Sequence, residues 1–389
     1  MIYLIPLIII IISILHYDIG NNNYRKKEIY ITIVFFLWAI SALSYRLGVD
    51  VVNNYMPEYD SIIEPLNKIS SDYLFETHNR QWGWMLLLSI TKTITPSFDF
   101  FKAFHALIIN FSFGYIIYKY FKFKFTALLC YYIYIYIPVN FEILREALAI
   151  SFFLLSTPYF LERKFIKYYL LTIIAFSFHI SAFILFLFPL TLKIEQSRFV
   201  IISLLIICVF SLAFVSQTQE LFYYLLFIES VSEKANYYFS SDTHGGSNYS
   251  ISNIINYFLN IIAPMLLILK AKEDDNIKKF APYIIVYVLI YTAATHISIF
   301  FRFNNYFNII FIYIYIQMFY SKHFLSRYNL KSRKIFLCIA ILFFCILKFK
   351  ILIQPIGNIP GYYRYYPYSS IIDKNTNSKR ESIYYLLNN

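Results

Sequence analysis

Three ionisable side chains open an apolar stretch near the middle of the chain: Glu142, Arg145 and Glu146 precede a largely apolar run that extends to residue 161. On a helix, Arg145 and Glu146 follow Glu142 by three and four residues, so the three side chains would gather at one helix mouth. Asn140 is the expected N-cap. Because a charge at the edge of a membrane segment is costly, these residues are candidate catalytic groups. The alternative is a local Glu–Arg pair that only lowers the cost of insertion.

Two further ionisable side chains stand at the ends of apolar runs. His179 closes one run, and its ordinary pKa of about 6.5 makes it the best proton acceptor near neutral pH. Arg302 opens another run, four residues before Tyr306. A guanidinium binds phosphate through paired, charge-assisted hydrogen bonds, so both Arg302 and Tyr306 are candidate substrate-binding residues. A packed histidine and an arginine that reaches back to the membrane surface are the structural alternatives.

A third group follows the second apolar run. Gly48 permits a tight turn that would present Arg46 and Asp50 together, with Tyr55 shortly after them. Together with the preceding residues, this set places arginines, a histidine and carboxylates at segment ends. Such a set favours binding of a lipid-linked pyrophosphate while a histidine or carboxylate accepts the proton of a sugar hydroxyl. The chemistry would be glycosyl transfer.

The elements that must position these residues are membrane helices. Of 389 residues, 59% are apolar and only 14% are charged. About 12 to 13 apolar segments can be counted, many long enough for a helix to cross ~30 Å of hydrocarbon. They lack the period-two alternation of a membrane barrel. The sequence therefore predicts an all-α, polytopic integral membrane protein with a single multi-pass domain over residues 1–389.

Basic residues gather in short connectors, such as residues 25–27 and 163–167. The positive-inside rule places these connectors in the cytoplasm and makes loops 46–80 and 216–250 and the tail 354–389 external. Parity then requires one incomplete segment, and residues 82–94 are the best candidate for a re-entrant one. Charge confined to connectors argues against a nucleic-acid partner.

Other residue types add little specific chemistry. The four cysteines lie in apolar runs without metal-ligand spacing, so neither a metal nor another cofactor is expected. The 39 tyrosines and 41 phenylalanines also follow from AT-rich coding and from interfacial belts. Trp82, Trp84 and the tyrosines of 362–368 are the better candidates for contact with a sugar.

Several of these blocks resemble the EpsG-like, Wzy-type polysaccharide polymerases. Residues 144–149 (LREALA), the connector 162–164 (ERK) and residues 175–182 (AFSFHISA) are similar to the core of that family. Weaker matches are Gly48 to Asp50 with Tyr55, Arg302 to Tyr306, and residues 367–370. Glu146 departs from the pattern, because the family usually has Gln after the arginine.

The resemblance implies metal-independent polymerisation at the outer face of the bacterial inner membrane. A growing chain on undecaprenyl pyrophosphate would pass to the next lipid-linked repeat unit of O-antigen or capsule. The partners would be this lipid-linked oligosaccharide, inner-membrane lipid and a chain-length regulator. The alternatives are an O-antigen ligase or other polyprenyl-phosphate-dependent glycosyltransferase, a flippase or transporter of the lipid-linked oligosaccharide, and a structural subunit of an export complex.

Overall fold

The computed structural model describes residues 2–70, 73, 80–194, 197–214, 251–270, 275–297, 300–320 and 354–388. Within these ranges the chain is helical and forms no β-strand, and two isolated bridges are its only β-like pairings. The prediction of an all-α protein is confirmed. The predicted external loop 216–250 lies outside the described residues. The chain divides into two compact units, residues 1–183 with 325–389 and residues 184–324.

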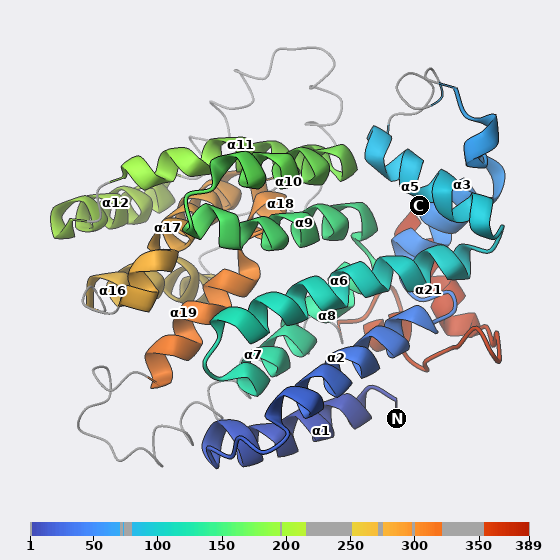
Figure 1. Ribbon diagram of the computed structural model, residues 1–389, viewed down its shortest axis with the longest axis horizontal. Helices are drawn as coiled ribbons and strands as arrows, with labels where there is room; N and C mark the ends of the chain where they lie inside the picture. Colours follow the sequence, from blue (N-terminus) through green and yellow to red (C-terminus); the bar gives the residue numbers. More distant parts are fainter. Residues whose placement is uncertain are drawn as a thin grey trace. The chain divides into compact units, whose positions relative to one another are not determined.

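The first unit contains both ends of the chain (Figure 1). Its α-helices are α1 (Leu4–Ser13), α2 (Lys26–Ala42), α3 (Met56–Ser61), α5 (Trp82–Ile94), α6 (Phe98–Tyr120), α7 (Lys124–Cys130), α8 (Tyr136–Phe141), α9 (Leu144–Leu161), α10 (Phe165–Phe178) and α21 (Ser378–Asn388). Short turns of π pitch cover Ile14–Ile19, Val51–Tyr55 and Tyr131–Ile135, and 3₁₀ turns cover Leu66–Lys68, Ile180–Phe183 and Gly361–Arg364.

Helix α6 forms the middle of the first unit and packs against α2 on one side and α9 on another. Buried polar side chains tie these helices together: the Tyr30 hydroxyl of α2 donates to the Gly114 carbonyl of α6 at 2.9 Å. The Asn110 amide of α6 donates to the Asn140 side-chain oxygen at 2.9 Å. Asn140 lies inside α8, and Ile143 precedes the first residue of α9. The prediction that Asn140 is the N-cap of this helix is therefore wrong. Its side-chain oxygen is already engaged by α6.

Three of the described helices are long and apolar enough to cross a membrane: Phe98–Tyr120, Leu144–Leu161 and Ile277–His296. Other apolar helices are shorter, between 10 and 17 residues. Most side chains of the three long helices are buried within the protein. This pattern is that of a polytopic membrane protein, as the sequence predicts.

The segment predicted to be re-entrant forms α5, which begins at Trp82 and ends at Ile94. At 1.5 Å per residue its 13 residues extend about 20 Å, less than the ~30 Å hydrocarbon layer. Its first turn packs closely on α10, because a Cβ atom on Gly83 would lie 2.2 Å from the Ser177 hydroxyl. The length suits a half-crossing, which stays a prediction.

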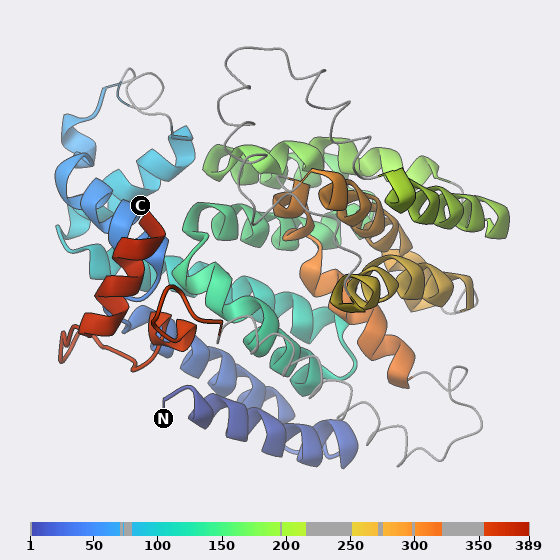
Figure 2. The same cartoon turned by 180° about the vertical axis from the view of Figure 1, so that it is seen from behind.

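The second unit is also helical (Figure 2). It comprises α11 (Ile184–Leu187), α12 (Arg198–Ser211), α15 (Ile251–Tyr257), α16 (Ala263–Lys270), α17 (Asp275–His296), α18 (Phe301–Asn304) and α19 (Asn308–Tyr320), with short turns at Phe188–Lys193, Leu212–Phe214 and Phe258–Ile262. Helix α17 packs on α16 and α19, and aromatic pairs such as Tyr287 and Phe311 fill the contact.

The C-terminal tail folds back onto the start of loop 46–80 within the first unit. Helix α21 lies beside the turn Val51–Tyr55 in both views (Figure 1 and Figure 2). Val49 and Val52 form a small apolar cluster with Ile383 and Tyr384. An antiparallel bridge from Ser44 to Ser370 adds a second attachment. The tail is thus part of the structure that holds residues 46–55.

Candidate functional site

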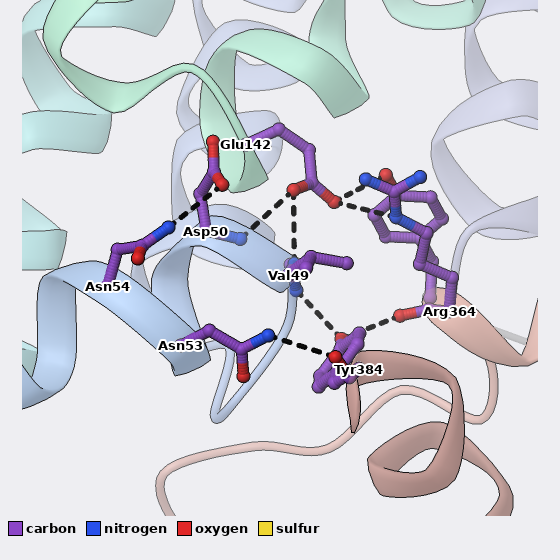
Figure 3. A network of polar contacts seen from close by, with 9 residues as sticks. Val49, Asp50, Asn53, Asn54, Glu142, Arg364 and Tyr384 are labelled. Carbon is purple, nitrogen blue, oxygen red and sulfur yellow. Dashed lines mark hydrogen bonds and ion pairs between the residues drawn. The ribbon is translucent and has the colours of Figure 1, made fainter. Parts of the chain in front are cut away.

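The Glu142 carboxylate is the centre of the polar network that the fold builds around these residues (Figure 3). Glu142 lies in the connection between α8 and α9, and its backbone N–H donates to the Pro138 carbonyl. Its Oε2 accepts the backbone N–H groups of Val49 at 3.0 Å and Asp50 at 3.3 Å. Its Oε1 accepts Arg364 Nε at 3.0 Å and the Tyr365 hydroxyl at 2.6 Å. One buried carboxylate therefore joins the loop, the α8–α9 connection and the tail.

Gly48 brings the loop close enough for these bonds. Its φ of +105° suits glycine, and a Cβ atom there would lie 1.7 Å from the Phe141 carbonyl oxygen. Its backbone N–H donates to the Tyr384 hydroxyl at 2.8 Å, and that hydroxyl donates to the Arg364 carbonyl at 2.8 Å. The turn expected at Gly48 is present, and its partner comes from the last helix of the chain.

Asp50 is half-buried beside Glu142, and within the described ranges its carboxylate accepts one hydrogen bond, from Asn54 Nδ2 at 3.2 Å. Burial raises the pKa of Asp50 above its usual range, and the Glu142 carboxylate raises it further. The Asn54 hydrogen bond, Arg364 and Arg145 act against that rise. A carboxylate with a raised pKa is a better proton acceptor than an ordinary aspartate.

Arg145 is the second residue of α9, and its side chain is only partly satisfied. Its Nη1 donates to Gln81 Oε1 at a long 3.4 Å, and its buried Nε has no partner in the part of the chain that the structure describes. Burial raises the pKa of Tyr55, and Arg145 opposes this. Arg145 therefore lies near Asp50 and Tyr55, which the sequence offers in a different motif. Glu142 precedes α9, and its carboxylate accepts hydrogen bonds from residues 49–50.

His179 lies where predicted, directly after α10 ends at Phe178. Its Nδ1 accepts the Ser181 backbone N–H at 3.2 Å and lies 2.6 Å from the Ser181 hydroxyl. Because Nδ1 accepts an N–H, hydrogen-bond geometry assigns the proton of the neutral ring to Nε2. His179 and Glu146 are both buried. Their catalytic roles stay predictions.

Arg46 has an ion-pair partner of its own. Its Nη2 lies 2.7 Å from Glu381 Oε2, and its Nε donates to the other oxygen, so Arg46 holds α21 through a paired contact. Its expected role in substrate binding stays a prediction. Arg302 and Tyr306 belong to the second unit, where Tyr306 is fully buried. Their predicted part in pyrophosphate binding with Arg145 stays a prediction.

Sequence reasoning missed Arg364, Tyr365 and Tyr384 as members of this network. The sequence does show an aromatic cluster at 362–368, but contacts across more than 200 positions leave no periodic signal. Among the described residues, no group of three or more His, Cys, Asp or Glu side chains is placed to hold a metal ion. The site as described is composed of arginine, carboxylate and tyrosine side chains.

Comparison with known proteins gives one match. A family model described as the EpsG family matches residues 27–370, which include Gly48, Asp50, Glu142, Arg145 and Arg364. Tyr384 and Glu381 lie beyond the matched segment. Neither a curated protein nor a solved structure matches the chain.

Proposed function

Since the chain belongs to the EpsG family, whose membership points to a membrane protein of polysaccharide biosynthesis, we propose that it is a polymerase of lipid-linked repeat units. The substrate would be an oligosaccharide of O-antigen or capsule on undecaprenyl pyrophosphate. The site would open to the outer face of the bacterial inner membrane. The observation that carries this proposal is the grouping of the Asp50 carboxylate with the Arg145 guanidinium at one end of a candidate membrane span.

The proposed reaction needs one proton acceptor and one site for negative charge. A hydroxyl of the acceptor sugar transfers its proton to Asp50 while its oxygen bonds to the anomeric carbon of the donor. The bond from that carbon to the pyrophosphate oxygen breaks, and the electron pair stays on the pyrophosphate. Arg145 is suited to stabilise that charge, because a guanidinium offers several donors in a fixed plane. His179 is the alternative proton acceptor.

The position of the ionisable residues at the ends of helices favours an enzyme over a flippase. A transporter is expected to carry ionisable residues near the membrane midplane, at the interface of two repeats. Here Asp50 precedes α3, Glu142 precedes α9 and Arg145 occupies its first turn. A ligase or a single-sugar transferase would use similar arginines, and the product separates these possibilities.

Gene deletion followed by gel analysis of the surface polysaccharide tests the proposal. Loss of a polymerase leaves one repeat unit on the lipid core, because transport and ligation still operate, and the plasmid-borne gene restores the ladder. Loss of a flippase removes every repeat, and loss of a ligase leaves polymer on its lipid carrier. An unchanged ladder in the deletion strain would contradict the proposal. Asp50→Asn, produced at the level of the natural protein, should fail to restore the ladder.

A further inference from the structure

Arg364, the last residue of the tail's 3₁₀ turn, has donors that the protein does not use. Its Nε donates to Glu142 Oε1, and its guanidinium lies 5.4 Å from the centre of the Tyr365 ring. Neither terminal nitrogen has a hydrogen-bond partner within the described part of the chain, and 30% of the side chain is exposed. Two guanidinium nitrogens are therefore available at the edge of the Glu142 network.

The structure holds this arginine firmly. Its carbonyl accepts the Tyr384 hydroxyl, which also accepts the Gly48 N–H, so one side chain fixes both the tail and the loop. Elsewhere in the tail, Arg380 is fully buried and donates to the Ser369 hydroxyl at 2.9 Å and to the Pro367 carbonyl. This attachment of the tail does not depend on the ion pair between Arg364 and Glu142. It gives the free end of Arg364 a defined position.

Arg145 is the second arginine of this region with unused donors. Its hydrogen bond to the neutral Gln81 side chain is long, it also hydrogen-bonds with the Tyr55 side chain, and its Nε is buried without a partner among the described residues. The negative charge available to these arginines is limited, because the Glu142 carboxylate already accepts four hydrogen bonds. Among the residues that the structure describes, Asp50 hydrogen-bonds to Asn54 and to no arginine. Two guanidinium groups near one carboxylate thus retain donors for an additional anion.

We infer that Arg145 and Arg364 together bind the diphosphate group of the lipid-linked donor, with Asp50 beside them to accept the proton. This inference rests on the proposed function and adds a tail residue to the substrate site. This arrangement of two arginines and one aspartate keeps the charge balanced during the reaction. The proton that neutralises Asp50 leaves the acceptor hydroxyl as negative charge develops on the departing diphosphate. Two guanidinium groups that face the same anion hold it better than either alone.

Binding assays with the purified full-length chain in lipid nanodiscs test the pair. The probes are farnesyl diphosphate, inorganic pyrophosphate and farnesol, so that the diphosphate and the lipid are assessed separately. Arg364→Lys and Arg145→Lys should each weaken binding of both diphosphate probes about tenfold or more, the loss expected from one or two charge-assisted hydrogen bonds. Farnesol binding should not change. The matched control is Arg163→Lys, at the exposed far end of α9.

A second measurement separates binding from a structural role. Because Arg380 is fully buried, an arginine-specific protease cuts after it only when the tail leaves the loop. Weaker diphosphate binding by Arg364→Lys with the tail still protected supports the inference. Wild-type affinity in this variant overturns it, and so does a loss of affinity that only parallels loss of protection. If affinity depends on both arginines but gene deletion leaves the ladder unchanged, the pair stands and the polymerase proposal fails. If the ladder depends on the gene but Arg364→Lys binds the diphosphate probes normally, the polymerase proposal stands and the arginine pair is wrong.

Discussion

At the scale of single residues, Glu142 and Asp50 are carboxylates with different tasks. Glu142 accepts four hydrogen bonds, two from the loop and two from the tail, so its oxygens are saturated by the protein. Such a group suits positioning better than proton transfer, although the sequence places it among the candidate catalytic residues. Asp50 accepts an exposed hydrogen bond from Asn54 and has a raised pKa, so it is the better proton acceptor.

The pH dependence of activity tests Asp50 through its neighbour Asn54. Protonated Asp50 cannot accept a proton, so kcat should fall as the pH drops through its raised pKa. The Asn54 hydrogen bond lowers that pKa because it stabilises the charged carboxylate. Asn54→Ala should therefore move the acid limb of the kcat profile to higher pH. The matched control is Asn53→Ala, which loses a bond to the Tyr384 carbonyl instead. A limb that stays in place or moves to lower pH would count against Asp50.

At the scale of elements, α21 is the helix whose contribution is least evident from its sequence. It is an 11-residue, amphipathic surface helix, yet Tyr384 reaches from it to the Gly48 N–H and the Arg364 carbonyl. It also pairs Glu381 with Arg46. The loop that carries Asp50, the α8–α9 connection and the tail thus depend on one another. A change in α21 should therefore alter the position of Asp50.

Tyr384→Phe tests this dependence with the loss of one oxygen atom. The variant leaves the buried Gly48 N–H without an acceptor, which costs about 1–3 kcal/mol of unfolding free energy. Activity should also fall, because the Gly48 and Arg364 backbones lose their shared attachment two residues from Asp50. Thermal unfolding in detergent and polysaccharide ladders measure the two effects. The matched control is Tyr385→Phe, whose side chain is 70% exposed and should behave as the natural protein does. Equal behaviour of the two variants would show that the bridge is dispensable.

At the scale of the whole molecule, local patterns predict the elements better than they predict the site. The helical class, the end of α10 before His179 and the bounds of α5 follow from apolar runs and their interruptions. The N-cap predicted at Asn140 is absent, because its side chain accepts a hydrogen bond from Asn110, on a helix 30 residues earlier in the sequence. The loop–tail contacts join positions more than 300 residues apart, and no period within the sequence encodes such a pairing. Gly48 predicts the turn itself but not the tail residue that contacts it.

Sidedness is the property of the whole molecule on which the proposed function depends. The sequence predicts that the apolar run that forms α2 crosses the membrane, so the two ends of this 17-residue helix should lie at opposite membrane faces. Position 24 precedes this helix in a basic connector, and the loop and tail after its other end are held together by the Arg46–Glu381 pair. We expect single cysteines at positions 60 and 372, in a protein without its natural cysteines, to react with an impermeant maleimide in spheroplasts.

Cysteines at positions 24 and 164 provide the opposite case, because both lie in basic connectors predicted to be cytoplasmic. They should react only after the membrane is permeabilised. All four positions are exposed, so burial does not account for a missing reaction. Labelling of 60 and 372 from opposite sides would contradict the docking of the tail onto the loop. Labelling of both only after permeabilisation would place Asp50 in the cytoplasm, where a polymerase of exported repeat units would not meet its substrate.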